Sequence, residues 1–182
     1  RPLSEFQIAK FFSEKCKSFH SYFRSCNLGG KTDSWCCNCP KCLFITIILS
    51  PFLSGEEIEK IFGENLLSKK EMLSDFDKLL GLSPEKPFEC VGMRDEVILS
   101  SHLTLKKYLD EKKELPILIS HFAEICGKDY DTENEYKKMI SFTSKKLGDI
   151  AFITKLAGFE HTIYIQGKCS HTKLDDSYIP LF

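Results

Sequence analysis

The sequence predicts a mainly helical fold with little β-structure. Apolar residues recur at helical spacing along most of the chain, and capping residues and glycines mark where the helices begin and end. Only residues 161–168, HTIYIQGK, alternate in the way that a strand does. A string of helices without a parallel sheet suits an annex to a larger α/β protein. We therefore expect residues 1–182 to form a single helical region of such a protein.

Two predicted helices flank a cysteine-rich loop near the start of the chain. The first spans residues 4–19, where Ser4 and Gln7 fit a capping box. Its predicted apolar stripe consists of Phe6, Ile8, Phe11, Phe12 and Cys16. The second helix begins at Pro40, which suits a first helical turn, and runs to about Leu49. Its residues are almost all apolar, so we expect it to be buried.

Further helices follow with the same start and stop signals. Ser54 and Glu57 form a capping box before a short helix that Gly63 ends. Ser68 is the predicted cap of the next helix, which Gly81 ends. The apolar stripe of that helix is Met72, Phe76, Leu79 and Leu80. A loop is expected over residues 83–92, and helices over residues 94–110, 115–126 and 132–145.

Composition limits the classes of partner. The chain is 42% hydrophobic and 28% charged, with a net charge of -1, so it offers no electrostatic reason to bind nucleic acid or an anionic membrane. The longest apolar run, residues 42–53, is shorter than the ~20 residues that span a bilayer. No signal peptide is recognisable, and the chain starts at Arg1 rather than Met. A processed chain and a fragment would both start in this way, and we expect a fragment of a cytoplasmic protein, without its N-terminal portion.

Five of the nine cysteines crowd into residues 26–42. Cys26, Cys36, Cys39 and Cys42 give the pattern C-x9-C-x2-C-x2-C, which presents four soft ligands for a tetrahedral zinc ion. Free thiols or a redox pair are the alternatives, but no thioredoxin-type strand precedes the motif. We predict a structural zinc knuckle over residues 24–44, in which four thiolates close the coordination sphere and Cys37 is the odd thiol.

The same stretch contains GGKTDS, which invites comparison with a Ser-Gly-Gly-x-Asp-Ser phosphate loop. Such loops follow a strand and close backbone N–H groups on phosphate oxygens. Here Leu28 replaces the leading Ser, one residue is inserted, and no strand precedes the glycines. We interpret Gly29, Gly30 and the residues after them as the spacer of the knuckle.

Several motifs together resemble a known enzyme family. YFRSCN, WCCNCPKCLF, FGENLL and KPFECVG are similar to the C-terminal region of UDP-N-acetyl-alpha-D-muramoyl-L-alanyl-L-glutamate epimerases, over roughly residues 20–95. The cysteine pattern is also similar to the zinc knuckle of 7-cyano-7-deazaguanine synthases, which are ATP-pyrophosphatase-like. The resemblance implies that this chain is the helical C-terminal part of a larger α/β protein whose nucleotide-binding portion lies outside it.

The resemblance also implies an activity. These epimerases invert the terminal L-Glu of UDP-MurNAc-L-Ala-L-Glu to D-Glu in peptidoglycan precursor synthesis, with ATP and Mg bound mainly outside the region that this chain represents. Conversion of the carboxylate to an acyl-adenylate makes the α-proton acidic enough for a side-chain base. Return of a proton from the other face inverts the centre. The implied partner is thus a UDP-linked muramoyl dipeptide.

Candidate site residues lie in two stretches. Cys90 and Glu89 are the catalytic candidates, because KPFECVG is a loop bounded by Pro and Gly; a buried thiol and a surface carboxylate are the alternatives. The candidates for binding substrate are Arg24, Asn27, Lys41 and Lys86. A salt bridge within the knuckle is the alternative for Arg24, charge compensation of the thiolates for Lys41, and solvation for Lys86.

Two departures from the family pattern bear on activity. Cys37 stands where related knuckles tend to have Gly, and Met93 stands where we expect an acidic residue. Trp35 is expected to pack over the knuckle, Asn65 to orient a loop or end a helix, and Cys169 with His171 is a weak second ligand pair. Two other functions remain open at this point: another ATP-pyrophosphatase-like enzyme, such as a 7-deazaguanine synthase or a tRNA-modifying enzyme, and a non-catalytic zinc-stapled interaction module.

Overall fold

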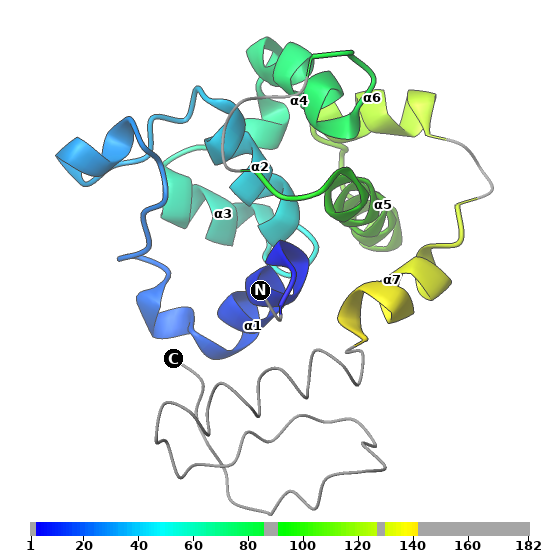
Figure 1. Ribbon diagram of the computed structural model, residues 1–182, viewed down its shortest axis with the longest axis horizontal. Helices are drawn as coiled ribbons and strands as arrows, with labels where there is room; N and C mark the ends of the chain where they lie inside the picture. Colours follow the sequence, from blue (N-terminus) through cyan, green and yellow to red (C-terminus); the bar gives the residue numbers. More distant parts are fainter. Residues whose placement is uncertain (1–2, 86–90, 127–129, 142–182) are drawn as a thin grey trace, which may run out of the picture. The chain divides into compact units, whose positions relative to one another are not determined.

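Helices and short 3₁₀ turns make up the regular structure in this computed structural model, which describes residues 3–85, 91–126 and 130–141 (Figure 1). The α-helices are α1 (Glu5–Lys15), α2 (Pro40–Leu49), α3 (Gly55–Phe62), α4 (Leu73–Leu80), α5 (Arg94–Asp110), α6 (Ile117–Ile125) and α7 (Thr132–Ile140). The 3₁₀ turns are η1 (Lys17–Phe19), η2 (Gly29–Thr32), η3 (Leu66–Ser68) and η4 (Lys70–Met72). No strand occurs within those residues, which confirms the mainly helical prediction. The expected strand at residues 161–168 lies outside them.

Helix α2 is the centre of the packing within the compact unit Ser4–Met139. Every side chain from Cys42 to Leu49 is buried, and α2 contacts α1, α4 and α5, which lie around it in Figure 1. A helix that is apolar on all sides must be covered on all sides, which explains this position. The prediction of a buried helix from Pro40 to Leu49 is confirmed. Neither α2 nor any other helix of the described residues has the length and apolar content needed to cross a membrane.

The two helices after α2, α3 (Gly55–Phe62) and α4 (Leu73–Leu80), are amphipathic, and each buries one face in the core that surrounds α2. Helix α4 contacts α2 directly. Ser54 caps α3 through a capping box with Glu57, and Gly63 ends the helix at a φ of 89°. Gly81 ends α4 at a φ of 73°. Both glycines adopt the left-handed conformation that favours Gly at a helix end, so these boundaries agree with prediction.

The predicted start of α4 at Ser68 is wrong. Asn65 instead accepts a hydrogen bond from the N–H of Leu67 and caps η3, of which Ser68 is the last residue. Lys69 is then extended, and the α-helix begins only at Leu73. The reason is local competition, because an Asn side chain three residues earlier offers the backbone a tight turn in place of a helical one.

The capping box of α1 is confirmed, but its predicted length and stripe are not. The helix ends at Lys15, after which the chain forms η1. Its buried face is Phe6, Ala9 and Ser13, whereas Ile8 and Phe11 are 37% and 38% exposed. Among the described residues, ten exposed positions, including these, keep large apolar side chains at the surface, so hydrophobicity alone did not identify the buried face.

Helix α5 is tied to its neighbours by two charged side chains. Glu96, only 3% exposed, accepts hydrogen bonds from the N–H groups of Met93 and of Phe6 in α1. Lys107 donates to the carbonyl oxygen of Ser50, the C-cap of α2, and at 2.6 Å to the carbonyl oxygen of Leu53 in the turn after this helix. Carbonyls at the end of a helix lack donors within it, so the ammonium of Lys107 provides the missing hydrogen-bond donor.

Candidate metal centre

Four cysteine sulfur atoms converge beside the start of α2. The Sγ atoms of Cys26, Cys36, Cys39 and Cys42 all lie within 4.8 Å of one another. Cys42 Sγ is 3.6 Å from Cys36 Sγ and 3.5 Å from Cys39 Sγ. A disulfide needs ~2.05 Å, whereas a tetrahedral zinc ion with Zn–S bonds of ~2.3 Å places its sulfurs about 3.8 Å apart. The four cysteines therefore have the donor set and the spacing for one tetrahedral metal ion.

The start of α2 supplies two of these thiols. Cys39 is the N-cap of the helix, and its Sγ accepts a hydrogen bond from the N–H of Cys42 at 3.4 Å. Pro40 occupies the first helical turn, where its missing N–H leaves no partner unsatisfied. The positive end of the helix dipole favours thiolates there. The Cys-x-x-Cys spacing thus becomes a cap and a first-turn residue whose sulfurs face the same point.

The distant ligand candidate, Cys26, is brought to the cluster by a tight turn. The N–H of Gly29 donates to Cys26 Sγ at 3.2 Å, and the N–H of Gly30 donates to the carbonyl of Cys26 at 2.8 Å. Ser34 then closes the turn by donating its N–H to the carbonyl of Gly29 at 2.9 Å. The backbone donors of both glycines are therefore used within the knuckle, which agrees with the interpretation of GGKTDS as its spacer.

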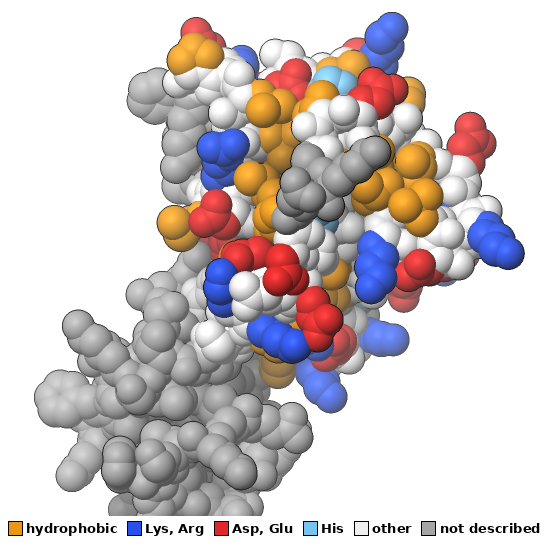
Figure 2. Space-filling view, turned by 90° about the vertical axis from the view of Figure 1, so that its right-hand side faces the viewer, with side chains coloured by type: hydrophobic (Ala, Val, Ile, Leu, Met, Phe, Trp, Pro, Cys, Tyr) orange, Lys and Arg blue, Asp and Glu red, His pale blue; other side chains and the backbone are white. Residues whose placement is uncertain are grey.

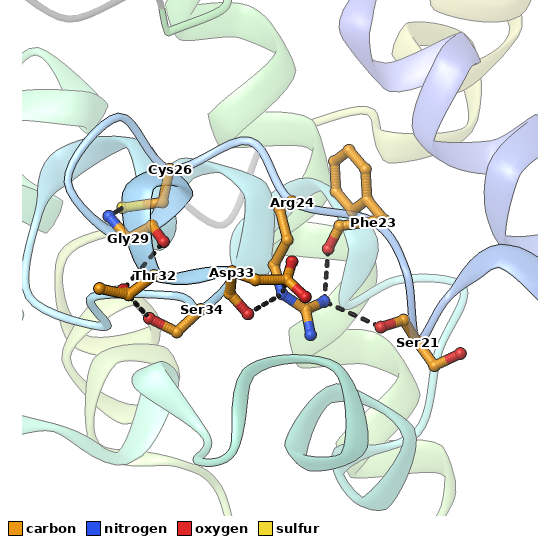
Figure 3. Close-up of polar contacts among 8 residues, drawn as sticks. All are labelled: Ser21, Phe23, Arg24, Cys26, Gly29, Thr32, Asp33 and Ser34. Carbon is orange, nitrogen blue, oxygen red and sulfur yellow. Dashed lines mark hydrogen bonds and ion pairs between the residues drawn. The ribbon is translucent and has the colours of Figure 1, made fainter.

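Arg24 fastens this loop, as Figure 3 shows. Its Nε donates to the carbonyl of Asp33 at 3.1 Å, and its Nη1 donates to the carbonyls of Ser21 and Phe23 at 3.0 and 2.8 Å. The carboxylate of Asp33 lies 3.8 Å from Nε, so the guanidinium also forms an ion pair within the loop. These contacts match the structural alternative for Arg24, and a substrate contact stays a prediction.

The other two substrate candidates of the knuckle face each other at its surface. Lys41 Nζ donates to Asn27 Oδ1 at 3.4 Å, and Lys41 lies in the sequence between Cys39 and Cys42. Four thiolates around a dication leave a charge of about -2, which a nearby ammonium offsets. Their role toward a substrate stays a prediction.

Electrostatics around the cluster differ from one thiol to the next. Burial raises the pKa of Cys36 to about 11, and burial also raises the pKa of Cys42. Burial opposes ionisation of Cys26 as well, but hydrogen bonds from the N–H groups of Gly29 and Cys36 outweigh it and lower the pKa of that thiol to about 6. A bound ion must displace the protons of Cys36 and Cys42, so affinity for metal falls as the pH falls.

The fifth thiol of this stretch points away from the cluster. Cys37 Sγ donates to the carbonyl of Phe62 at 3.2 Å, at the end of α3, and Lys69 Nζ donates to the carbonyl of Cys37 at 2.9 Å. Burial, and after it the charge of Glu64, raises the pKa of the Cys37 thiol to about 11. The φ of Cys37 is 50°, a left-handed conformation that Gly adopts without strain. The Gly that the resemblance leads us to expect at this position would adopt the same conformation without strain.

Trp35, which belongs to the knuckle segment, packs on aromatic rings outside that segment, and its expected packing over the knuckle stays a prediction. It is 8% exposed, and its ring packs between Phe23 and Phe62 with centroid distances of 5.4 and 4.5 Å. Aromatic contacts of this kind contribute about 0.5–1.5 kcal/mol each beyond the area that they bury. They join the cysteine loop to the end of α3 without depending on a metal.

Met93 occupies the N-cap of α5 and is 69% exposed. An acidic residue at an N-cap accepts hydrogen bonds from the first N–H groups of the helix, which Met cannot do. We expect Met93→Asp to raise the free energy of unfolding by about 0.5–1 kcal/mol, measured by urea denaturation, with Met93→Ala as the neutral control. A destabilised Met93→Asp protein would contradict capping as the role of the acidic residue that we expected at this position.

The catalytic candidates Glu89 and Cys90 lie outside the described residues, as do Lys86 and the pair Cys169 and His171.

Sequence reasoning did not anticipate a groove of about 360 Å³ between α4, α5 and α6, with Arg94 in its lining. The groove draws its walls from four separated segments, and no local motif marks such a site. The one available signal was a charged residue two positions after the KPFECVG motif.

Comparison with known proteins places these features in context. The profile of the MurL C-terminal domain matches residues 18–137 of this chain, which include the whole cysteine cluster. A protein of Salinispora tropica named UDP-N-acetyl-alpha-D-muramoyl-L-alanyl-L-glutamate epimerase is 39% identical over 107 residues, which are 57% of this chain and 23% of that protein. Proteins of the same name from Micromonospora sp. and Xanthomonas oryzae pv. oryzae are 34% identical over 122 residues and 40% identical over 98 residues.

The alignments cover different shares of the two chains. The Micromonospora alignment covers 65% of this chain and 27% of the relative, and the Xanthomonas alignment covers 50% and 22%. This chain therefore spans about a quarter of the length of the curated relatives it matches. No solved structure is significantly similar to it.

Proposed function

Because this chain belongs to the MurL C-terminal domain family, we propose that it is the C-terminal part of an ATP-dependent epimerase that inverts the terminal L-Glu of UDP-MurNAc-L-Ala-L-Glu to D-Glu. The observation that carries the proposal is the family match over residues 18–137, supported by the name that the three relatives share. The resemblance inferred from the sequence motifs is thereby confirmed. The proposed reaction belongs to peptidoglycan precursor synthesis in the cytoplasm.

The reaction sets two requirements for the protein. The hydrogen on the α-carbon is very weakly acidic beside a free carboxylate, and ATP, with Mg, would remove that charge by activating the carboxylate. A side-chain base must then take the proton, and an acid must return one from the opposite face. Glu89 and Cys90 are the groups of this chain that we propose for these roles.

The cysteine cluster has a different role in this proposal. Four thiolates fill a tetrahedral zinc site, so no position stays open for substrate or water. The cluster joins the loop after α1 to the first turn of α2. We infer a structural zinc ion that fixes this loop on the helical core, and we assign it no chemical step.

The test of the proposed function uses the complete gene product that contains this chain. It is incubated with ATP, Mg²⁺ and UDP-MurNAc-L-Ala-L-Glu, and AMP and the configuration of the terminal glutamate are measured. Formation of AMP together with a D-Glu product supports the proposal. A protein with bound zinc that forms neither product contradicts it and favours the non-catalytic interaction module.

The same assay tests the two catalytic candidates. We expect Glu89→Gln and Cys90→Ala each to lower kcat by at least ~100-fold, because general acid–base groups contribute about 10²–10⁴-fold. The matched controls are Glu85→Gln, an exposed carboxylate paired with Lys78, and Cys16→Ala, which lies outside the cluster. Full activity of either candidate variant removes that residue from the mechanism.

A further inference from the structure

The groove between α4, α5 and α6 has a mostly apolar wall, to which Leu80, Ile98 and Phe122 contribute. Figure 2 views the molecule from the side on which α5, α6 and α7 lie in Figure 1, and hydrophobic side chains gather among charged ones on that face. Ligand pockets range from ~300 to 1,000 Å³, so a groove of about 360 Å³ holds one end of a large substrate.

Arg94 stands at this groove as an exposed guanidinium held in place from one side. A Cβ atom on Gly81 would lie 2.9 Å from Arg94 Cδ and Nε and 3.2 Å from Cζ, so the arginine side chain lies flat against that glycine. Within the described residues no carboxylate or carbonyl pairs with Arg94. A guanidinium that is positioned but unpaired is suited to bind an anion bidentately.

The charge of the groove indicates which anion. Among the described residues that line it, Arg94 is the only one with a permanent positive charge. His102 is stacked on Tyr130 at a centroid distance of 4.0 Å, and burial lowers the pKa of His102, which disfavours a positive charge on its ring. A single cation beside hydrocarbon matches one carboxylate on a short aliphatic stem, whereas a diphosphate would need several donors.

We propose that Arg94 binds the side-chain carboxylate of the substrate's terminal glutamyl residue, with the aliphatic part of the L-Ala-L-Glu end in the groove. This rests on the proposed function. The terminal residue carries two carboxylates, and the one next to the α-carbon loses its charge when it is activated. Only the side-chain carboxylate stays anionic throughout, so it is the group that a fixed guanidinium can hold during the whole reaction.

The test compares two substrates that differ at this carboxylate, UDP-MurNAc-L-Ala-L-Glu and UDP-MurNAc-L-Ala-L-Gln, with the complete gene product. Arg94→Gln is expected to raise KM for the glutamyl substrate about 10- to 100-fold and to change KM for the glutaminyl substrate less than about threefold. Arg94→Lys keeps the charge but loses the bidentate geometry, so its effect is intermediate. Lys78→Gln removes a nearby charge outside the groove lining and should leave KM within about twofold.

Each outcome bears on one claim. Equal losses for the two substrates overturn the assignment of Arg94, because a purely structural arginine cannot distinguish carboxylate from amide. Absence of epimerisation by the unmodified protein overturns the proposed function instead. In that case calorimetric binding of UDP-MurNAc-L-Ala-L-Glu to the unmodified protein and to Arg94→Gln decides the inference, and equal affinities overturn it. If Arg94→Gln does not fold, Arg94→Lys provides the same comparison.

Discussion

Cys42→Ala is expected to abolish stoichiometric metal binding and to lower the free energy of unfolding by at least ~5 kcal/mol, roughly 10–20 °C in Tm. The reason is geometric, because Cys42 is fully buried and its sulfur lies within 3.6 Å of two other cluster sulfurs. Structural zinc contributes an apparent ~10–16 kcal/mol in small domains, which is comparable to the whole stability of an ordinary protein. Metal content by mass spectrometry and a calorimetric melt measure the two effects.

The matched control is Cys37→Ser. Cys37 directly follows the ligand candidate Cys36 and lies two residues before the ligand candidate Cys39. Its hydroxyl can still donate to the carbonyl of Phe62, and its sulfur is not among the four that converge. We expect this variant to keep one metal ion per chain and to melt within a few degrees of the unmodified protein. If Cys37→Ser loses the metal while Cys42→Ala retains it, the ligand set is wrong.

The helices that could be predicted are those whose ends carry their own chemistry. Ser54 with Glu57 begins α3, Pro40 begins α2, and Gly63 and Gly81 end helices in the left-handed conformation that only Gly adopts cheaply. Each signal acts over three or four residues, so its effect on the helix boundary does not depend on how the rest of the chain packs. The same locality explains why the bounds of α5, which follow from its acidic first turn and apolar spacing, agree with the expected residues 94–110.

The incorrect predictions for α1 and α4 have a common physical cause. In each case two local interactions or two faces compete, and a single sequence motif does not show which one prevails. Ser68 is a residue type that commonly caps helices, but the Asn65 side chain caps the 3₁₀ turn η3 instead, and α4 begins only at Leu73. In α1 the sequence offers two apolar faces, and only packing against the core selects the one with Phe6 over the one with Ile8 and Phe11. For Arg24 the sequence allowed a salt bridge within the knuckle but did not identify its partner, and only the folded loop brings Asp33 back to accept the Nε–H.

The candidate metal centre could be predicted because ligand type and spacing encode it locally, whereas the groove could not. Cys39 and Cys42 need only the first turn of one helix to face the same ion. Arg94, Leu80 and Phe122 meet only after three helices have packed. Non-local sites of this kind follow from tertiary structure, and the sequence gives no spacing rule for them.

The adjacent glycines of GGKTDS should respond oppositely to alanine. A Cβ atom at Gly29 would lie 2.0 Å from the carbonyl oxygen of Ser34 and 3.0 Å from the N of Cys36, and both are backbone atoms that cannot swing away. Gly29→Ala must therefore shift the turn that presents Cys26, and we expect a loss of about 3 kcal/mol in unfolding free energy and a lower metal affinity. Urea denaturation and competition with a zinc chelator measure these quantities.

Gly30→Ala is the control, and it also separates the two interpretations of the stretch. A Cβ atom at Gly30 meets nothing within 4 Å, and its φ is not in the left-handed region, so alanine should be neutral or stabilise by up to ~1 kcal/mol. A phosphate loop needs both glycines, because both backbones approach the ligand. A knuckle spacer needs only the glycine that packs against Ser34. Sensitivity at both positions would contradict the knuckle, since the N–H of Gly29 already serves Cys26 and that of Gly30 serves its carbonyl.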